Sequence, residues 1–182
     1  MERHTQYMIF ALMLATISET NGCDRRPPPQ HEGVATFTTP YDGQVFFVPT
    51  GDMIKLTGHV TGLPPGRTLG VHIHEMGNVG NNCSDAGGHY NPKNKTHGGL
   101  TGPNRHLGDL GNIQTDSSGR MLFDLSVEEP RRGWMHDFIG LTLVIHSGQD
   151  DLGVNPDQGS KTTGNSGSRL ACATIGFRHR TY

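Results

Sequence analysis

The stretch D-M-I-K-L-T-G-H-V-T, Asp52–Thr61, decides the fold class of this chain. Apolar and polar side chains alternate along it, with Ile54, Leu56 and Val60 set against Lys55, Thr57 and His59. Because successive side chains of a strand point to opposite faces, the alternation predicts a strand with one buried face. The turn-forming sequence L-P-P-G-R, Leu63–Arg67, follows and ends this strand.

Strand character recurs on both sides of this stretch. We predict strands over Gly33–Thr39, Gln44–Val48, Leu69–Glu75, Ile113–Thr115, Met121–Val127, Ile139–His146 and Leu170–Phe177. The first two flank a Y-D-G turn, and the fourth and fifth flank D-S-S-G, so each of these pairs is predicted to form a hairpin. No segment has a convincing apolar period of about 3.6 residues, the period of an α-helix.

Two long stretches lack strand character and are rich in glycine and polar residues. They are Met76–Leu107 and Ser147–Arg169. Loops of this length in a compact domain are usually functional or disordered, and the first carries several of the histidines described below. The chain is therefore predicted to be all-β, an antiparallel barrel or sandwich with two long functional loops.

The N-terminal region differs from the rest of the 182 residues. Arg3 and His4 precede an apolar run, Tyr7–Ile17, and small or polar residues follow it. This layout predicts a secretory signal peptide over residues 1–22, because the run is too short to span a membrane. An uncleaved anchor or a buried helix is the alternative. Residues 23–32 are then a proline-rich linker and residues 33–182 the folded domain, a size that suits one core.

The net charge limits the classes of binding partner, and the cysteines bear on whether the chain is secreted. A net charge of −2 gives no case for binding nucleic acid or, once the signal is cleaved, a membrane surface. Of the three cysteines, Cys23 lies outside the folded domain and Cys83 and Cys172 lie inside it. A Cys83–Cys172 disulfide is therefore favoured in a secreted chain, and Cys23 is either spare or an intermolecular partner.

Six of the eleven histidines form a pattern with one aspartate. The set is His72, His74, His89, His97, His106, His146 and Asp109. His72 and His74 are two apart in a predicted strand, so both imidazoles lie on one face and can reach one metal. Imidazole suits copper and zinc, and three imidazoles with a carboxylate complete a closed zinc shell. The set is too large for one tetrahedral metal and suits two adjacent metals that share a histidine.

The stretches that carry these residues resemble the copper/zinc superoxide dismutases, and the N-terminus points to an extracellular type. The matching stretches are G-V-H-I-H-E, G-G-H-Y-N-P, H-G-G, R-H-L-G-D-L-G-N, L-V-I-H, D-D-L-G and G-N-S-G-S-R-L-A-C. The resemblance implies an eight-stranded antiparallel Greek-key β-barrel that binds one copper and one zinc per chain. It also implies a secreted homodimer that dismutates superoxide to dioxygen and hydrogen peroxide.

The resemblance also assigns roles to individual residues. It places copper on His72, His74, His89 and His146, and zinc on His89, His97, His106 and Asp109. His89 would bridge the metals and carry a proton during turnover, while Arg169 would hold the superoxide anion at the copper site. Asp150 would link His72 to His97 from behind. Cys83 and Cys172 match the intrachain disulfide of the family.

Two rival functions belong to other classes, and two motifs remain outside the function. A copper chaperone or metal-storage domain would carry an N-terminal M-x-C-x-x-C motif or lose copper ligands, and a structural module would bind zinc alone. The chain has the complete ligand set and no such motif. Asn82-Cys-Ser and Asn94-Lys-Thr are N-glycosylation sequons. The apolar residues offered for a dimer surface or for the core are Met76, Phe138, Ile139, Ile175 and Phe177.

Overall fold

The computed structural model of the protein describes residues 31–128 and 137–178. The predicted signal peptide, residues 1–22, and Cys23 lie outside the described residues, as does most of the predicted linker. Glu32, the last residue of that linker, is the first residue of strand β1.

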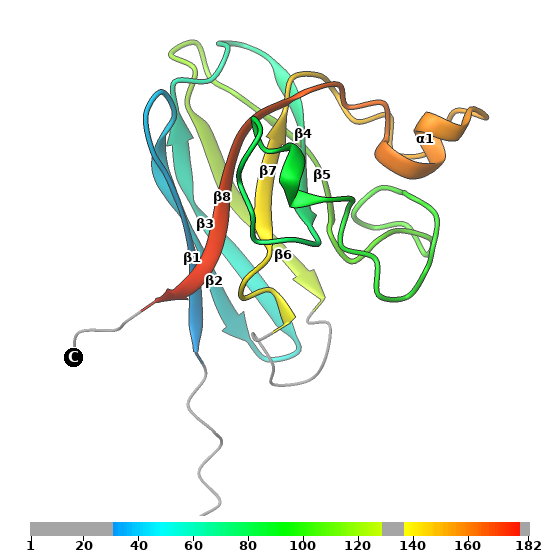
Figure 1. The fold of residues 1–182 in the computed structure, drawn as a ribbon, viewed down its shortest axis with the longest axis horizontal. Helices are drawn as coiled ribbons and strands as arrows, with labels where there is room; N and C mark the ends of the chain where they lie inside the picture. Colours follow the sequence, from blue (N-terminus) through cyan, green and yellow to red (C-terminus); the bar gives the residue numbers. More distant parts are fainter. Residues whose placement is uncertain (1–30, 129–136, 179–182) are drawn as a thin grey trace, which may run out of the picture.

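Eight strands form one antiparallel sheet that curls into a nearly closed barrel (Figure 1). They are β1 (Glu32–Phe37), β2 (Asp42–Thr50), β3 (Met53–Thr61), β4 (Thr68–His74), β5 (Asp109–Gln114), β6 (Met121–Glu128), β7 (Thr142–His146) and β8 (Arg169–Arg178). The order across the sheet is β5-β4-β7-β8-β1-β2-β3-β6. The chain crosses the barrel between β3 and β4 and again between β6 and β7, which confirms the predicted Greek-key, all-β class.

The barrel interior is the apolar core. Ile54, Leu56 and Val60 of β3 are completely buried, whereas Lys55 and His59 between them are exposed. The same alternation sends Ile73 of β4 into the core. Burial of each such side chain contributes about 1.5–3 kcal/mol, so this interior holds the strands in register.

The hairpin predicted around D-S-S-G is wrong. β5 and β6 are the two edges of the sheet and meet at one isolated bridge, between Thr115 and Met121. The connection from β3 to β4 takes the backbone bonds that a hairpin ladder would use. Leu63 N donates to Gly119 O at 3.1 Å, and Thr115 N donates to Arg67 O at 2.8 Å. Beyond this point β5 pairs with β4 and β6 pairs with β3.

The two long loops lie on one side of the barrel, over β4, β5 and β7 (Figure 1). The first connects β4 to β5 and contains one short 3₁₀ turn, η1 (Ser84–Ala86). The second connects β7 to β8 and contains a six-residue helix, α1 (Gln158–Thr163), that the apolar pattern does not predict. The Asp157 side chain caps α1 by accepting from Ser160 N at 2.9 Å. Within the described residues, no helix is long and apolar enough to cross a membrane.

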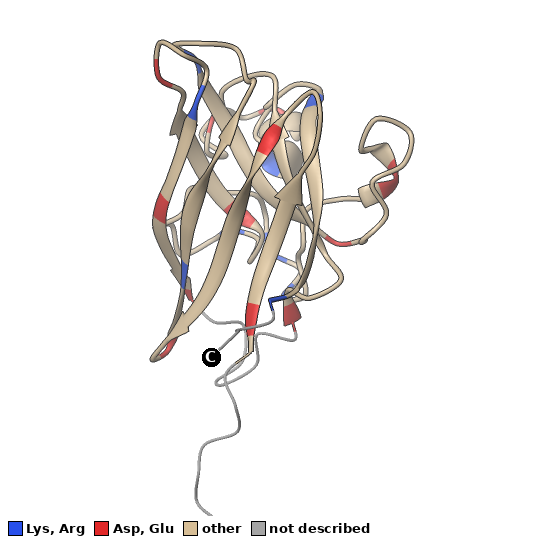
Figure 2. Cartoon of the chain, turned by 90° about the vertical axis from the view of Figure 1, so that its left-hand side faces the viewer, with Lys and Arg blue, Asp and Glu red and all other residues tan. Residues whose placement is uncertain are grey.

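The apolar residues offered for a dimer face differ in their exposure to solvent. Phe138 and Ile175 are fully buried and belong to the core, whereas Met76 and Phe177 are about half exposed, at 54% and 51%. On the side turned toward the viewer in Figure 2, acidic and basic residues are scattered and neither sign gathers into a patch. Of the residues offered for that face, Met76 in the first loop and Phe177 on β8 therefore remain available for an apolar contact.

Candidate metal centre

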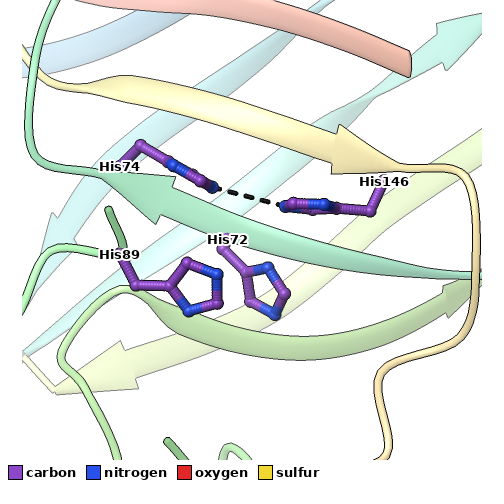
Figure 3. Close-up of side chains that lie close together, drawn as sticks. All are labelled: His72, His74, His89 and His146. Atoms are coloured by element: carbon purple, nitrogen blue, oxygen red, sulfur yellow. Dashed lines mark hydrogen bonds between the residues drawn. The ribbon is translucent and has the colours of Figure 1, made fainter. Parts of the chain in front are cut away.

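Four histidines from two strands and one loop meet on the outer face of the barrel (Figure 3). His72 and His74 come from β4, His146 ends β7, and His89 is joined to His74 by an isolated β-bridge. Ile73, between the first two, points into the core instead. We call His72, His74, His89 and His146 the first histidine group. One potential ligand atom from each lies within 4.8 Å of the others.

The ring nitrogens of this group face a common space without the partners that buried polar atoms normally have. His74 Nε2 and His146 Nε2 are 3.3 Å apart (Figure 3). Among the described residues, His72 Nδ1 and His89 Nε2 are buried and have no hydrogen-bond partner. An unpaired buried nitrogen is costly, so two unpaired nitrogens beside the close His74–His146 pair indicate a site for a shared ligand rather than a packing defect. A metal that prefers imidazole fits this space.

The opposite nitrogen of each strand histidine is held from behind. His72 Nε2 lies 2.9 Å from Asp150 Oδ2. His74 Nδ1 lies 2.9 Å from the carbonyl of Gly87, and His146 Nδ1 lies 3.3 Å from the carbonyl of Gly167. A carbonyl can only accept, so these two nitrogens carry the proton and their Nε2 atoms are left as free lone pairs. Such outer contacts fix the orientation and tautomer of metal-binding histidines.

A second set of side chains converges on the carboxylate of Asp109, the first residue of β5. We call His89, His97, His106 and Asp109 the second histidine group. Asp109 Oδ1 lies 2.9 Å from His89 Nδ1, 3.0 Å from His97 Nδ1 and 3.2 Å from His106 Nδ1. His97 Nδ1 is buried without an aligned hydrogen bond among the described residues, despite that short distance. Three imidazoles and one carboxylate are the donor set of a closed zinc site.

His89 belongs to both groups because its two nitrogens face opposite ways. Its Nδ1 faces Asp109 and its Nε2 faces the first group. The ring of His72 stacks on that of His89 with centroids 3.9 Å apart. This closeness also brings His72 within 4.8 Å of the ligand atoms of His89, His97 and Asp109, but its Nε2 is taken by Asp150. Its free Nδ1 therefore serves the first group.

Asp150 is the second link between the groups. Its Oδ1 lies 2.8 Å from His97 Nε2, while its Oδ2 contacts His72. The side chain of Asn112 on β5 grips the backbone of Asp150 from both sides: Asn112 Nδ2 donates to Asp150 O and Asp150 N donates to Asn112 Oδ1, each at 2.8 Å. Gly164 has a φ of 64°, and a Cβ there would overlap the Asp150 carboxylate and His97.

The two groups differ in charge. Burial, followed by the neighbouring His89, lowers the pKa of His72 to about 3 and that of His74 to about 2. Burial likewise lowers the pKa of His146 to about 4. Burial alone would also lower the pKa of His97, but its contacts with Asp109 and Asp150 outweigh it and raise that pKa to about 9. At neutral pH the first group is therefore uncharged where it is built from strands, and the second contains an ion pair.

The carboxylates stay ionised despite burial. Burial by itself would raise the pKa of Asp109, but hydrogen bonds from His106, His89 and His97 hold it well below its usual range. The pKa of Asp150 is lowered in the same way by hydrogen bonds from His72 and His97. Each carboxylate is thus an anion at neutral pH, ready to bind or to orient a cation.

A disulfide and an arginine tie the first loop to β8 beside the first group. Cys83 and Cys172 are bonded with their Cα atoms 5.9 Å apart, which confirms the predicted pairing. Arg169, at the start of β8, donates to the carbonyls of Cys83, Ser84 and Gly87. Gly87 O accepts from Arg169 and also lies 2.9 Å from His74 Nδ1, and Arg169 is the backbone partner of His146 between β7 and β8. It is half-buried and lines a surface pocket of about 780 Å³.

All seven predicted ligand residues thus lie in one buried cluster, with Asp150 and Arg169 at its margins. Asn112 and Gly164 were not singled out from the sequence. Asn112 follows Asp109 by three residues inside the matching stretch H-L-G-D-L-G-N, and Gly164 stands in T-T-G-N-S-G. Their positions inside these stretches could have marked them as site residues. Their contacts with Asp150, however, join segments that are distant in the sequence.

Comparison with known proteins gives the same picture over the whole domain. The family model described as copper/zinc superoxide dismutase matches residues 32–175. An extracellular copper/zinc superoxide dismutase of Schistosoma mansoni is 53% identical over 146 residues, which are 80% of this chain and 79% of the relative. One of Caenorhabditis elegans is 48% identical over 134 residues, which are 74% of this chain and 60% of the relative. A solved structure, of the clock protein EA4, shares 36% identity with a TM-score of 0.75 and covers 81% of this chain and 94% of that one.

Proposed function

This chain belongs to the copper/zinc superoxide dismutase family, and from that premise we propose how its two histidine groups divide the work. The enzyme converts two superoxide ions and two protons into dioxygen and hydrogen peroxide, with copper and zinc as cofactors. It acts outside the cell, as do the relatives named extracellular. We propose that residues 1–22 direct this secretion, that residues 23–32 form a linker, and that residues 33–182 are the dismutase domain.

We assign copper to the first group and zinc to the second, one ion of each per chain. The copper donors are His72 Nδ1 and the Nε2 atoms of His74, His89 and His146. The zinc donors are the Nδ1 atoms of His89, His97 and His106, with Asp109 Oδ1. The opposed nitrogens of His89 carry this assignment: one is 2.9 Å from Asp109 Oδ1, and the other is buried and unpaired among the described residues. When bound, copper supplies one-electron redox chemistry, and zinc, which has none, supplies a fixed charge.

The residues around the metals position the substrate and a proton. Arg169 carries a charge that no protein environment removes, and its guanidinium donates to the same Gly87 carbonyl that His74 Nδ1 contacts. Superoxide is a small anion, so Arg169 attracts it and holds it beside the first group. His89 Nε2 is the atom that takes up a proton and returns it, while Asp109 orients the ring through Nδ1.

Exposed apolar side chains of β8 and the first loop favour self-association. Met76, Val79 and Phe177 are exposed apolar side chains around β8 and the first loop. We propose that two copies pair through this region as a homodimer. Sedimentation of the metal-loaded protein at micromolar concentration should give twice the chain mass. A monomer at that concentration would contradict the pairing.

The decisive experiment is superoxide dismutation by the protein loaded with copper and zinc, with bound metals counted on the same sample. His146→Ala should lose copper and dismutation together. His59→Ala, which removes an exposed histidine of β3, should keep both. Fast dismutation that His146→Ala abolishes supports the enzyme and its copper site. Full occupancy by both metals without dismutation would overturn the enzymatic role and leave metal carriage.

A further inference from the structure

Two tripeptides of the chain have the form Asn-X-Ser/Thr, and the dismutase function uses neither. They are Asn82-Cys83-Ser84 and Asn94-Lys95-Thr96, both in the loop between β4 and β5. In a secreted protein this tripeptide is the acceptor for an N-linked glycan, which is bulky and stands at the surface. The two tripeptides differ in their surroundings in the folded protein. We propose that Asn94, and not Asn82, carries an N-linked glycan. The inference rests on the secretion included in the proposed function.

The Asn94 tripeptide forms the apex of a turn that is braced within its own loop, at the far end by Lys95 Nζ, which donates to Pro103 O at 2.8 Å. Asn91 Nδ2 donates to Lys95 O at 2.7 Å, and Lys95 N donates to Asn91 Oδ1 at 2.9 Å. Asn94 has a φ of 47°, in the left-handed region that asparagine tolerates well. Asn94 and Thr96 are both exposed, and the Asn94 side chain makes no hydrogen bond within the described residues. A sugar on this amide therefore displaces no packing and breaks no contact.

The Asn82 tripeptide is tied to a distant strand through its middle and last residues. Cys83 is buried and bonded to Cys172 of β8, 89 residues away in sequence. The carbonyls of Cys83 and Ser84 both accept hydrogen bonds from Arg169. Asn82 itself lines the 780 Å³ pocket with Arg169. Asn82 is exposed, but a glycan there would stand over the guanidinium that attracts superoxide and would obstruct its access.

A glycan on Asn94 has a different neighbour. Asn94 lines a pocket of about 530 Å³ whose wall includes His89, His106 and Lys161. This pocket opens toward the second histidine group and is separate from the pocket beside Arg169. The first sugars on Asn94 therefore stand over the solvent route to the zinc ligands and leave the route to Arg169 clear.

The test expresses the full 182-residue chain in a eukaryotic secretory host, with a foreign signal sequence joined ahead of Met1 so that export does not depend on the chain's own N-terminus. Intact mass and glycopeptide mapping should show one glycan, on Asn94. Asn94→Gln and Thr96→Ala should abolish it, Thr96→Ser should keep it because the tripeptide survives, and Asn82→Gln should leave it unchanged. A glycan on Asn82, or none on either residue, would overturn the proposal.

A second measurement on the same samples tests the position of the sugar. Zinc release to a chelator should be slower from the glycosylated protein than from Asn94→Gln and Thr96→Ala alike. Equal release rates would overturn the placement over the zinc route. Dismutation is assayed separately: its absence would count against the proposed function, whereas an unmodified Asn94 in an active enzyme counts against this inference alone.

Discussion

The two histidine groups share a residue, yet they are built in opposite ways. Three members of the first group project from β4 and β7, and hydrogen bonds to carbonyl groups or to Asp150 hold their other nitrogens. In the second group, His97 and His106 come from a loop and are gathered around the buried carboxylate of Asp109. The first group is therefore preformed by the sheet, whereas the second is held together by an internal ion pair whose place zinc takes.

Because the two groups are built differently, the copper site and the zinc site should depend on different parts of the structure. Rigid elements hold ligands more accurately than loops do, so the copper half should depend on the stability of the barrel. The zinc half should depend on the charge at Asp109 and on the contacts that fasten the loops. Variants of single residues can separate these dependences.

The largest expected effect is at Asp109. Asp109→Asn removes the central charge of the second group, and zinc affinity should fall by at least about a hundredfold, since roughly 10–16 kcal/mol shared among four ligands is about 2.5–4 kcal/mol each. Competition with a chromophoric chelator measures this. Asp124→Asn, at an exposed carboxylate of β6, is the matched control. Wild-type zinc affinity in Asp109→Asn would show that the two groups do not differ in this way.

The core beneath the first group should come next. Ile73→Ala opens a cavity between His72 and His74 on the inner face of β4 and should cost about 3 kcal/mol of unfolding free energy, with Ile73→Val costing about 1 kcal/mol. Denaturant unfolding of the metal-free protein measures both. At saturating copper, the visible spectrum of Ile73→Ala should match the wild type, because the strand still directs both histidines outward. A changed spectrum would mean that the sheet does not preform the group.

The pH dependence of metal binding should separate the halves without any mutation. His97, with a pKa near 9, is protonated in the metal-free protein at neutral pH, so zinc must displace that proton. Its raised pKa stabilises the metal-free fold below the ordinary value of 6.5, and this contribution is lost as pH rises through about 9. Zinc affinity should therefore rise about tenfold per pH unit from pH 7 toward 9.

Copper affinity should lack that proton-linked rise. His72, His74 and His146 have pKa values of about 3, 2 and 4, so they are already neutral at pH 7. Calorimetric titrations in buffers of different ionisation enthalpy measure the protons released when each metal binds. Zinc binding should release about one more proton than the three rings release when copper binds. Equal release by the two metals in singly loaded samples would remove the contrast.

A smaller effect is expected at Asn112, which holds Asp150 without touching either group. Asn112→Ala frees the backbone of Asp150 and should weaken zinc binding about tenfold, the effect typical of residues that orient ligands from behind. Gln114→Ala, at an exposed position of the same strand, should change nothing. Chelator competition provides the measurement, and an unchanged affinity in Asn112→Ala would mean that the loop is fixed by other contacts.

The smallest effect should be that of salt on the rate. Gln158 and Gly159 carry no charge, and Lys161 Nζ is bound to the carbonyl of Gly153. Lys161 keeps its charge but lines the pocket beside His106, so Arg169 is the cation that we expect to guide superoxide to the first histidine group. The rate constant for superoxide should fall only about twofold between roughly 0.01 and 0.15 M ionic strength. A steep fall would show that other charges guide the anion.

Sequence reasoning reached the strands, the loops and every member of both groups, because each of these leaves a local or family pattern. The alternation at Ile54, Leu56 and Val60 predicted β3, and the H-x-H spacing placed His72 and His74 on one face. The separation of β5 from β6 was missed because Thr115 is paired by a connection 48 residues earlier in the chain. A turn-forming sequence such as D-S-S-G predicts the turn itself, but it does not predict which strands pair on either side of the turn.

Helix α1 was missed, and the choice between core and dimer surface for two apolar residues was left open, for related reasons. Helix α1 has six residues and one buried side chain, Ser160, which is too little to leave an apolar period. Phe138 and Ile175 are apolar whether they face the core or a partner, so composition cannot separate the two fates. Asn112 is a polar residue of a strand, and its task at Asp150 appears only when the second loop is folded over β5.

The carboxylate of Asp150, which contacts His72 with one oxygen and His97 with the other, makes the two metal sites thermodynamically coupled. Any ion that reorients one histidine shifts the carboxylate and so changes the affinity at the other site. Such coupling is reciprocal: the factor by which bound zinc changes copper affinity must equal the factor by which bound copper changes zinc affinity. The enzyme therefore has one joint binding equilibrium for two different metals, and the supply of either ion in a cell or medium sets how fully the other site is filled.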